Sequence, residues 1–234
     1  MALVKYGAGI VQMSGSIAGN TFARNRYGNY VRAKTKPINP NTERQGTIRN
    51  SVSALVEAWN DILSDAQRVG WNLYASSVAM TNKLGETVHL SGFNHYVRSN
   101  SIRLQCGPAS RIDAPPTTFS LPVTDPTLSI ACQNDNTIDI TYDDTMPWCD
   151  LANEQIMLFM GQPQSPGRNF FAGPWRYAWR AVGSIGSPPA SPAEGIAPPF
   201  VITPGQKVWF YARISKADGR LTTKFFDGPV TVAS

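Results

Sequence analysis

The chain changes character along the stretch Lys36-Pro37-Ile38-Asn39-Pro40-Asn41-Thr42-Glu43-Arg44-Gln45. Two prolines three residues apart exclude a helix at its start and hold the residues before them extended. Thr42 and Gln45 then have the spacing of a capping box, which predicts that a helix begins here. A stiff connector that leads directly into a capped helix favours a role in assembly over a role in catalysis.

The segment before this connector carries the positive charge of the chain. Residues 1–50 hold eight Lys or Arg and a single carboxylate, Glu43, whereas the whole chain of 234 residues has a net charge of +5. Glycines divide this segment into short extended pieces. The rest of the chain is close to neutral, so the charge points to a partner for the N-terminal segment alone.

Two short strands are expected in this segment, at Ile10–Met13 and Tyr30–Thr35, with a turn at Asn25–Asn29 before the second. Alternation in the second strand predicts that three cations share one face: Arg32, Lys34 and Lys36. A ribbon this small is not stable alone, and it needs the body or a neighbouring subunit to pack on. We therefore expect residues 1–40 to form an extended basic arm.

The arm admits two classes of partner. Cations interleaved with aromatic rings could follow a nucleic-acid backbone, with the rings stacking on bases. They could equally lie across an acidic protein lattice and link subunits. The charge is diluted by Gly, Ala and Asn and contains no run of five or six cations, which favours the protein lattice. The candidate partner-binding residues are Arg24, Arg26, Tyr27, Tyr30, Arg32, Lys34, Lys36 and Asn39.

Three helices are predicted within residues 41–107. The first covers 42–63, where apolar residues recur at spacings of three and four. Ser64 and Gln67 repeat the capping-box spacing, so a second helix begins there with Trp71, Tyr74 and Val78 on one side. Asn82 to Gly85 predicts a turn. Ser91 caps a third helix, which ends at Gly107-Pro108 and points four residues inward: Phe93, Tyr96, Val97 and Leu104.

From residue 108 to 234 the pattern is that of an antiparallel β-sandwich. A Pro-rich linker at 114–117 is followed by short β-rich runs with Pro and Gly between them, and Asn134-Asp135-Asn136 predicts a hairpin. A Pro/Ser/Ala-rich loop is expected at Ser184–Pro199. The seven expected strands are Leu128–Cys132, Thr137–Tyr142, Gln155–Met160, Trp175–Val182, Lys207–Ile214, Leu221–Phe226 and Pro229–Val232. The predicted fold class is therefore α+β.

The alternation of Trp175, Tyr177 and Trp179 predicts that these rings share one face of a strand. That face could be core or an exposed binding stripe, and the base rate of buried aromatics favours core.

No chemistry-bearing motif is found. Cys106, Cys132 and Cys149 share no metal spacing, and neither His89 nor His95 accompanies a nucleophile elbow. No phosphate-binding glycine loop occurs. We expect no enzyme activity, cofactor or metal. The N-terminus lacks a signal peptide and no run is long enough to span a membrane, so a soluble protein made in a reducing cytoplasm is expected.

Two resemblances to known families add to this interpretation. The run from Thr203 to Arg213, Thr-Pro-Gly-Gln-Lys-Val-Trp-Phe-Tyr-Ala-Arg, resembles the turn and strand of fibronectin type III and related immunoglobulin-like domains. The chain departs from them where the usual corner tyrosine would fall, near Val208. The resemblance implies that the predicted sandwich is immunoglobulin-like.

The second resemblance spans residues 15–107 and is to small structural proteins encoded in tailed-phage and prophage gene clusters. Its marks are the Lys36–Thr42 connector with Gln45 and Arg49, Trp59, Gln67-Arg68 with Trp71, and Leu90-Ser91-Gly92-Phe93-Asn94. The resemblance implies a virion protein, present in many copies or as a homo-oligomer, that contacts the major capsid protein or other virion proteins.

A capsid-bound cement or decoration protein is the role we favour, because an arm that orders on binding can lock capsid subunits. A neck or tail component of the same particle and a nucleic-acid-binding protein acting through the arm remain alternatives.

Overall fold

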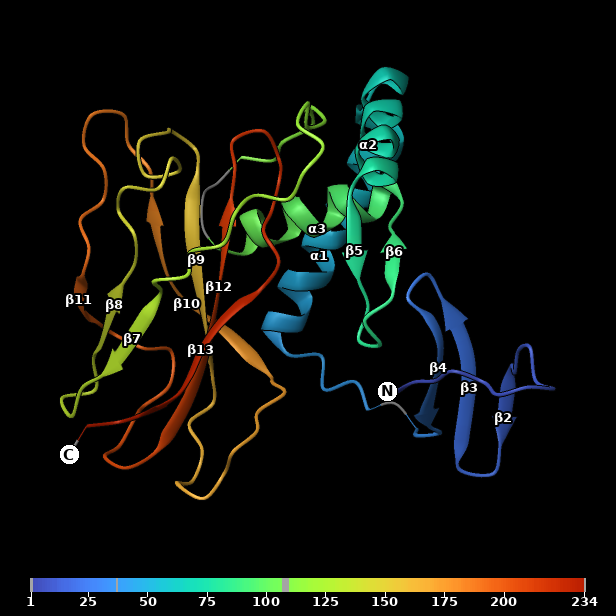
Figure 1. The fold of residues 1–234 in the computed structure, drawn as a ribbon, viewed down its shortest axis with the longest axis horizontal. Helices are drawn as coiled ribbons and strands as arrows, with labels where there is room; N and C mark the ends of the chain where they lie inside the picture. The colour runs from blue at the N-terminus through green and yellow to red at the C-terminus, as the bar shows by residue number, and fades with distance from the viewer. Residues whose placement is uncertain (1, 37, 107–109, 234) are drawn as a thin grey trace. The chain divides into compact units, whose positions relative to one another are not determined.

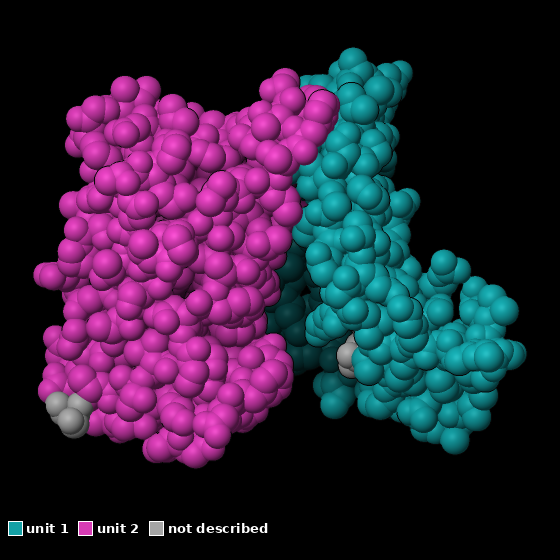
Figure 2. Space-filling model, viewed as in Figure 1, with its two compact units in different colours: residues 1–95 teal, residues 96–234 magenta. Residues whose placement is uncertain are grey.

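The computed structural model describes residues 2–36, 38–106 and 110–233. Helices and antiparallel sheets are both present, so the predicted α+β class is confirmed (Figure 1). The chain divides into two compact units, residues 1–95 and 96–234 (Figure 2). The three-part division predicted from the sequence stays a prediction. Its boundary at 107/108, the Gly107-Pro108 helix stop and Pro37 all lie outside the described residues.

The first unit begins with a four-stranded antiparallel sheet instead of a two-stranded ribbon. The sheet has the order β1-β4-β3-β2. Its strands are β1 (Ala2–Leu3), β2 (Gly15–Ile17), β3 (Asn20–Asn25) and β4 (Gly28–Ala33).

Two expectations for this sheet are wrong. Ile10–Met13 is not a strand, because it lies between Gly9 and Gly15, whose φ angles of 98° and 104° turn the backbone out of an extended path. Strand β4 ends at Ala33, so Lys34 and Lys36 lie beyond it. The three cations expected on one strand face are therefore not arranged in that way.

Both capping boxes predicted from the sequence are present. Thr42 caps α1 (Glu43–Glu57), where its Oγ1 accepts from the Gln45 backbone N–H at 3.4 Å, and a π-helical turn, Ala58–Ile62, follows. Ser64 caps α2 (Asp65–Ser77) in the same way, with 3.3 Å between its Oγ and the Gln67 backbone nitrogen.

The helices bury fewer apolar residues than their periodicity predicts. Leu55 and Ala58 are fully buried, whereas Ile48, Val52 and Val56 on the predicted apolar stripe of α1 are exposed. On α2, the prediction that Trp71 and Tyr74 face inward is confirmed, together with Val78 just after the helix. The core of the first unit is therefore built mainly against α2.

An unpredicted hairpin follows α2. It consists of β5 (Ala79–Thr81) and β6 (Thr87–His89), joined by the turn that Asn82 to Gly85 predicts. The hairpin leads into α3 (Gly92–Gln105).

The buried face of α3 is polar, contrary to the sequence prediction. Of the four apolar residues expected inward, Tyr96 is buried and the other three are half-buried. Four polar side chains are buried in their place: His95, Ser99, Asn100 and Arg103. The helical period was predicted correctly, but hydrogen bonding decides which face is inside.

Seven strands form two antiparallel sheets in the second unit (Figure 1). One sheet has the order β11-β8-β7 and the other the order β10-β9-β12-β13. The strands are β7 (Ser129–Cys132), β8 (Ile138–Thr141), β9 (Gln155–Gly161), β10 (Trp175–Val182), β11 (Ala193–Ile196), β12 (Lys207–Ser215) and β13 (Phe225–Thr231).

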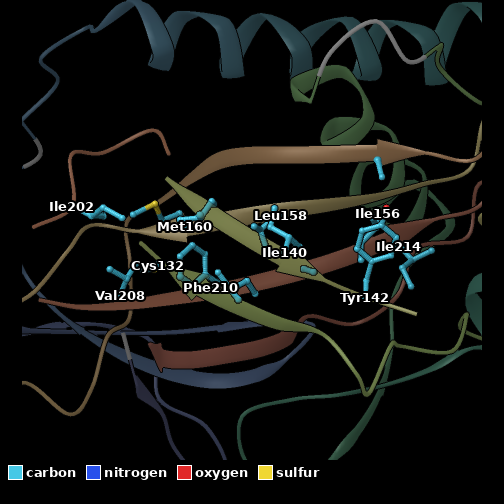
Figure 3. Close-up of a cluster of buried hydrophobic side chains, with 14 of the residues drawn as sticks. Cys132, Ile140, Tyr142, Ile156, Leu158, Met160, Ile202, Val208, Phe210 and Ile214 are labelled. Carbon is cyan, nitrogen blue, oxygen red and sulfur yellow. The ribbon is translucent and has the colours of Figure 1, made fainter. Parts of the chain in front are cut away.

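Both sheets contribute to one hydrophobic core (Figure 3). Ile140 of β8, Leu158 of β9 and Phe210 of β12 are among its members, and each is at most 1% exposed. A smaller cluster on the outer face of the four-stranded sheet joins Phe159 and Tyr211 to Cys106, which follows α3. The strands of the larger sheet are therefore covered on both faces, which explains the uninterrupted burial of β9.

The strand expectations were correct in number but not in detail. The hairpin around Asn134–Asn136 is confirmed, with Cys132 opposite Ile138. In place of the two strands expected at Leu221–Phe226 and Pro229–Val232 there is a single strand, β13, which begins only at Phe225, and Leu221 forms an isolated bridge with Ser215. The remaining strand, β11, lies in the Pro-rich run that was expected to be a loop.

Trp175, Tyr177 and Trp179 do not share one face. The register of β10 against β9 shifts between Tyr177 and Trp179, as in a β-bulge. Trp175 and Tyr177 consequently pack with the outer cluster, and Trp179 packs with the core between the sheets. A bulge reverses the alternation of every residue after it, and nothing local in the sequence marks its position.

Candidate partner-binding surface

No side chain of the N-terminal sheet is buried. Every described residue from 2 to 36 is exposed or half-buried, whichever face of the sheet it lies on. This segment contains six Lys or Arg and no Asp or Glu. The sheet is therefore a positively charged layer without a core of its own.

The candidate residues on β3 and β4 lie on two opposite faces. Arg32 pairs with Thr21 and Tyr30 pairs with Ala23, so these side chains share a face. Arg24 pairs with Asn29 and lies on the other face, beside Phe22 and Val31. The cations thus do not form one stripe, although the sequence pattern predicts one.

Arg24, Arg26 and Tyr27 come together at the β3–β4 turn. They line an open cleft of about 920 Å³ whose other side is formed by the β5–β6 hairpin, including Glu86 and Val88. Beside it lies a second hollow of about 420 Å³, lined by Leu3, Thr81 and the ring of Tyr27 among others. These two hollows meet around Tyr27, Asn25 and Asn82.

Three polar contacts lie at the cleft, and two of them join its sides: Asn82 with Tyr27, and Lys5 with Glu86. The side-chain amide of Asn82 donates to the backbone oxygen of Tyr27 at 2.9 Å and to Glu86 Oε2 at 3.1 Å. Lys5 Nζ lies 2.6 Å from Glu86 Oε1. Hydrogen bonding from Lys5 and then from Asn82 lowers the pKa of Glu86, so this carboxylate is ionised at neutral pH.

The remaining candidate residues lie elsewhere. Lys34 and Lys36 are exposed beyond the end of β4. Asn39 accepts a hydrogen bond from Arg49 Nη2 at 2.7 Å, and Asn41 accepts from Nη1 at 3.3 Å, so Arg49 braces the connector against α1. Asn39 is therefore positioned to shape the connector more than to touch a partner.

The residues that sequence reasoning missed are Lys5, Asn82, Glu86 and Val88. Asn82 and Tyr27 are 55 residues apart, and the hairpin that carries Asn82 was not predicted. The sequence signal for Asn82 was local: an Asn at the start of a turn typically bonds the backbone through its side chain.

Of the two histidines weighed in the sequence analysis, one lies in the interior of the protein. His95 is fully buried, with its ring 5.1 Å from that of Tyr74. Among the described residues, no group of three or more His, Cys, Asp or Glu side chains gathers as metal ligands would. Within the same residues, no helix is long and apolar enough to cross a membrane. No protein-family model, curated protein or solved structure matches this chain.

Proposed function

We propose that this protein is a non-enzymatic structural component of a tailed-phage virion, a cement or decoration protein that docks on the capsid through its N-terminal sheet. The observation that carries the proposal is the sheet itself. Residues 2–36, which form these four strands and their loops, contain six cations, no carboxylate and no buried residue, so the layer is expected to gain stability by packing against a partner. A capsid lattice repeats such a surface many times.

The second unit suits the part of such a protein that projects from the shell. Among the described residues, seven strands in two antiparallel sheets over one core support the proposal that this unit is an immunoglobulin-like sandwich. The turn and strand at Thr203–Arg213 support the assignment. Its core needs no partner, because both sheets already cover it.

The test is the copy number of the protein in purified particles, measured by quantitative mass spectrometry. Hundreds of copies per particle are the expected result for a protein on the shell. About a dozen copies or fewer would place it at the neck or tail instead. Absence from the particles would overturn the structural role.

Zero-length carbodiimide cross-linking of the same particles tests the docking face. Lys34 and Lys36, which are exposed beyond the end of β4, should form bonds to carboxylates of the major capsid protein. Lys224, an exposed lysine of the second unit, is the internal control and should form no such bond. Cross-links confined to lysines of the second unit would show that the second unit docks instead.

A further inference from the structure

The cleft at the β3–β4 turn has a chemical character that the sheet as a whole does not have. Arg24 and Arg26 are exposed at its wall. The carboxylate lining it is that of Glu86, which is already engaged by Lys5 at 2.6 Å. The cleft therefore presents two guanidinium groups, of which that of Arg24 makes a long hydrogen bond of 3.5 Å to Gln12 Oε1, and its own carboxylate is ion-paired.

Guanidinium groups bind carboxylates in a planar, bidentate geometry, which gives direction as well as attraction. Glu86 shows that this wall accommodates a carboxylate, since Lys5 and Asn82 both contact it. A second carboxylate on the side of Arg24 and Arg26 would meet guanidinium groups instead of an ammonium and an amide.

The neighbouring hollow supplies an apolar subsite. It is lined by Leu3, Tyr27 and Thr81 together with three polar residues, Asn25, Asn82 and Lys83, and Tyr27 also lines the cleft with the arginines. A side chain bound there would lie next to a carboxylate bound by the arginines. Because the two hollows share Asn25, Tyr27 and Asn82, one extended ligand can reach both.

We propose that this cleft binds an acidic peptide segment of a partner protein, with carboxylates against Arg24 and Arg26 and an apolar side chain beside Tyr27. Under the proposed function, that partner is a capsid protein. The inference rests on the proposed function for this point alone. Nucleic acid fits less well, because among the described residues only three cations line the two hollows, Arg24, Arg26 and Lys83, whereas binding along a phosphate backbone takes a longer positively charged groove.

The experiment uses the full chain and three probes: the blocked peptide Glu-Glu-Leu-Glu-Glu, its analogue with Lys in place of every Glu, and the oligonucleotide dT10. Binding is followed by amide chemical shifts and by calorimetry. The acidic peptide should shift the amides around Tyr27 and Val88, and the Lys analogue should not. The double variant Arg24→Gln/Arg26→Gln should weaken peptide binding at least tenfold.

The matched control is Arg168→Gln/Arg176→Gln, which removes the same two guanidinium charges from exposed positions of the second unit. It should change the affinity less than twofold, and both variants should keep the wild-type amide spectrum outside the altered sites. Equal weakening by the two variants would reduce the effect to net charge and overturn the proposal. Tighter binding of dT10 with the same dependence on Arg24 and Arg26 would make this a nucleic-acid site.

No binding of the acidic peptide would also overturn the inference, whatever the copy number in particles. Conversely, a protein that binds the peptide through Arg24 and Arg26 but is absent from particles would keep the inference and lose the virion role. The peptide-binding experiment thus tests the cleft, the copy-number experiment tests the virion role, and either one can fail without the other.

Discussion

The guanidinium of Arg103 donates a hydrogen bond to Ser215 Oγ at 2.9 Å and so ties α3 to the end of β12. The same side chain donates to the backbone oxygens of Ser110 and Asn153, at 3.2 and 3.1 Å. Arg103 is only 2% exposed. Burial lowers its pKa, and the charge of Glu154 acts in the opposite direction. One buried cation thus organises three separate segments around the end of the four-stranded sheet.

Replacing Arg103 by Met should lower the free energy of unfolding by about 2–4 kcal/mol, because the apolar stem is kept while buried acceptors lose their donor. Urea unfolding followed by tryptophan fluorescence measures the change. Arg176→Met removes an exposed arginine from β10 and should cost less than about 1 kcal/mol. Equal losses in the two variants would show that the buried hydrogen bonds of Arg103 add nothing.

Gly183 is required by a close approach of backbone. A Cβ at this position would lie 2.0 Å from the carbonyl oxygen of Trp148 and 2.5 Å from that of Leu151. The Gly183 amide also donates to Glu154 O at 2.9 Å, so the segment cannot move away without losing that bond.

We expect Gly183→Ala to destabilise the protein by about 3 kcal/mol, since backbone must shift to admit the methyl group. Gly167→Ala is the control, because nothing lies within 4 Å of the position that its methyl group would take, and the effect should stay below about 0.5 kcal/mol. Thermal unfolding of both variants measures the difference in stability. A Gly183 variant as stable as the control would mean that the loop yields easily.

Buried thiols and tyrosines make the free energy of unfolding depend on pH in the alkaline range. Burial raises the pKa of Cys132 and of Cys149 from an ordinary 9.0 to about 12. Burial also raises the pKa of Tyr142 and of Tyr211 from 10.0 to about 12. Above pH 9 the unfolded chain loses these protons while the folded chain keeps them, so the free energy of unfolding must fall as pH rises from 9 towards 12.

The urea midpoint should therefore be constant from pH 7 to about 8.5 and decrease steadily above about pH 9. In the Cys132→Ala/Cys149→Ala variant the decrease should begin about one pH unit later, when the tyrosines of the unfolded chain ionise. A midpoint that stays level to about pH 10.5 would contradict the burial of these groups.

The parts of the fold that were predictable depend on residues close in sequence. Thr42 with Gln45 and Ser64 with Gln67 gave both helix starts correctly, because a capping box is complete within one helical turn. The hairpin at Asn134–Asn136 was predictable for the same reason.

The parts that failed depend on tertiary contacts. The bulge after Tyr177 is set by the pairing of β10 with β9, and it sends Trp179 to the opposite face. The burial of Arg103 depends on acceptors as distant as Ser215. In the candidate site, the turn residues Arg26 and Tyr27 were named because cations and aromatic rings alternate along the arm. Glu86, across the cleft, was not predicted because no local pattern connects it to them.

The last prediction concerns how the N-terminal sheet is held to the rest of its unit. Asn82 is 7% exposed and makes two kinds of contact. Its Oδ1 accepts from the backbone N–H groups of Leu84 and Glu86, at 2.9 and 3.0 Å, and thereby closes the β5–β6 turn. Its Nδ2 donates to Tyr27 O and fixes the β3–β4 turn.

Asn82→Asp separates these two contacts, because the acid keeps the acceptor of the turn but loses the donor to Tyr27 and repels Glu86. We expect amide hydrogen exchange in residues 20–33 to become at least tenfold faster, while residues 65–77 of α2 exchange as in the wild type. Asn82→Ala removes both contacts and should also speed exchange in β5 and β6. If residues 20–33 of the Asp variant exchange at the wild-type rate, then the Lys5–Glu86 ion pair and the strand ladder hold the sheet without Asn82.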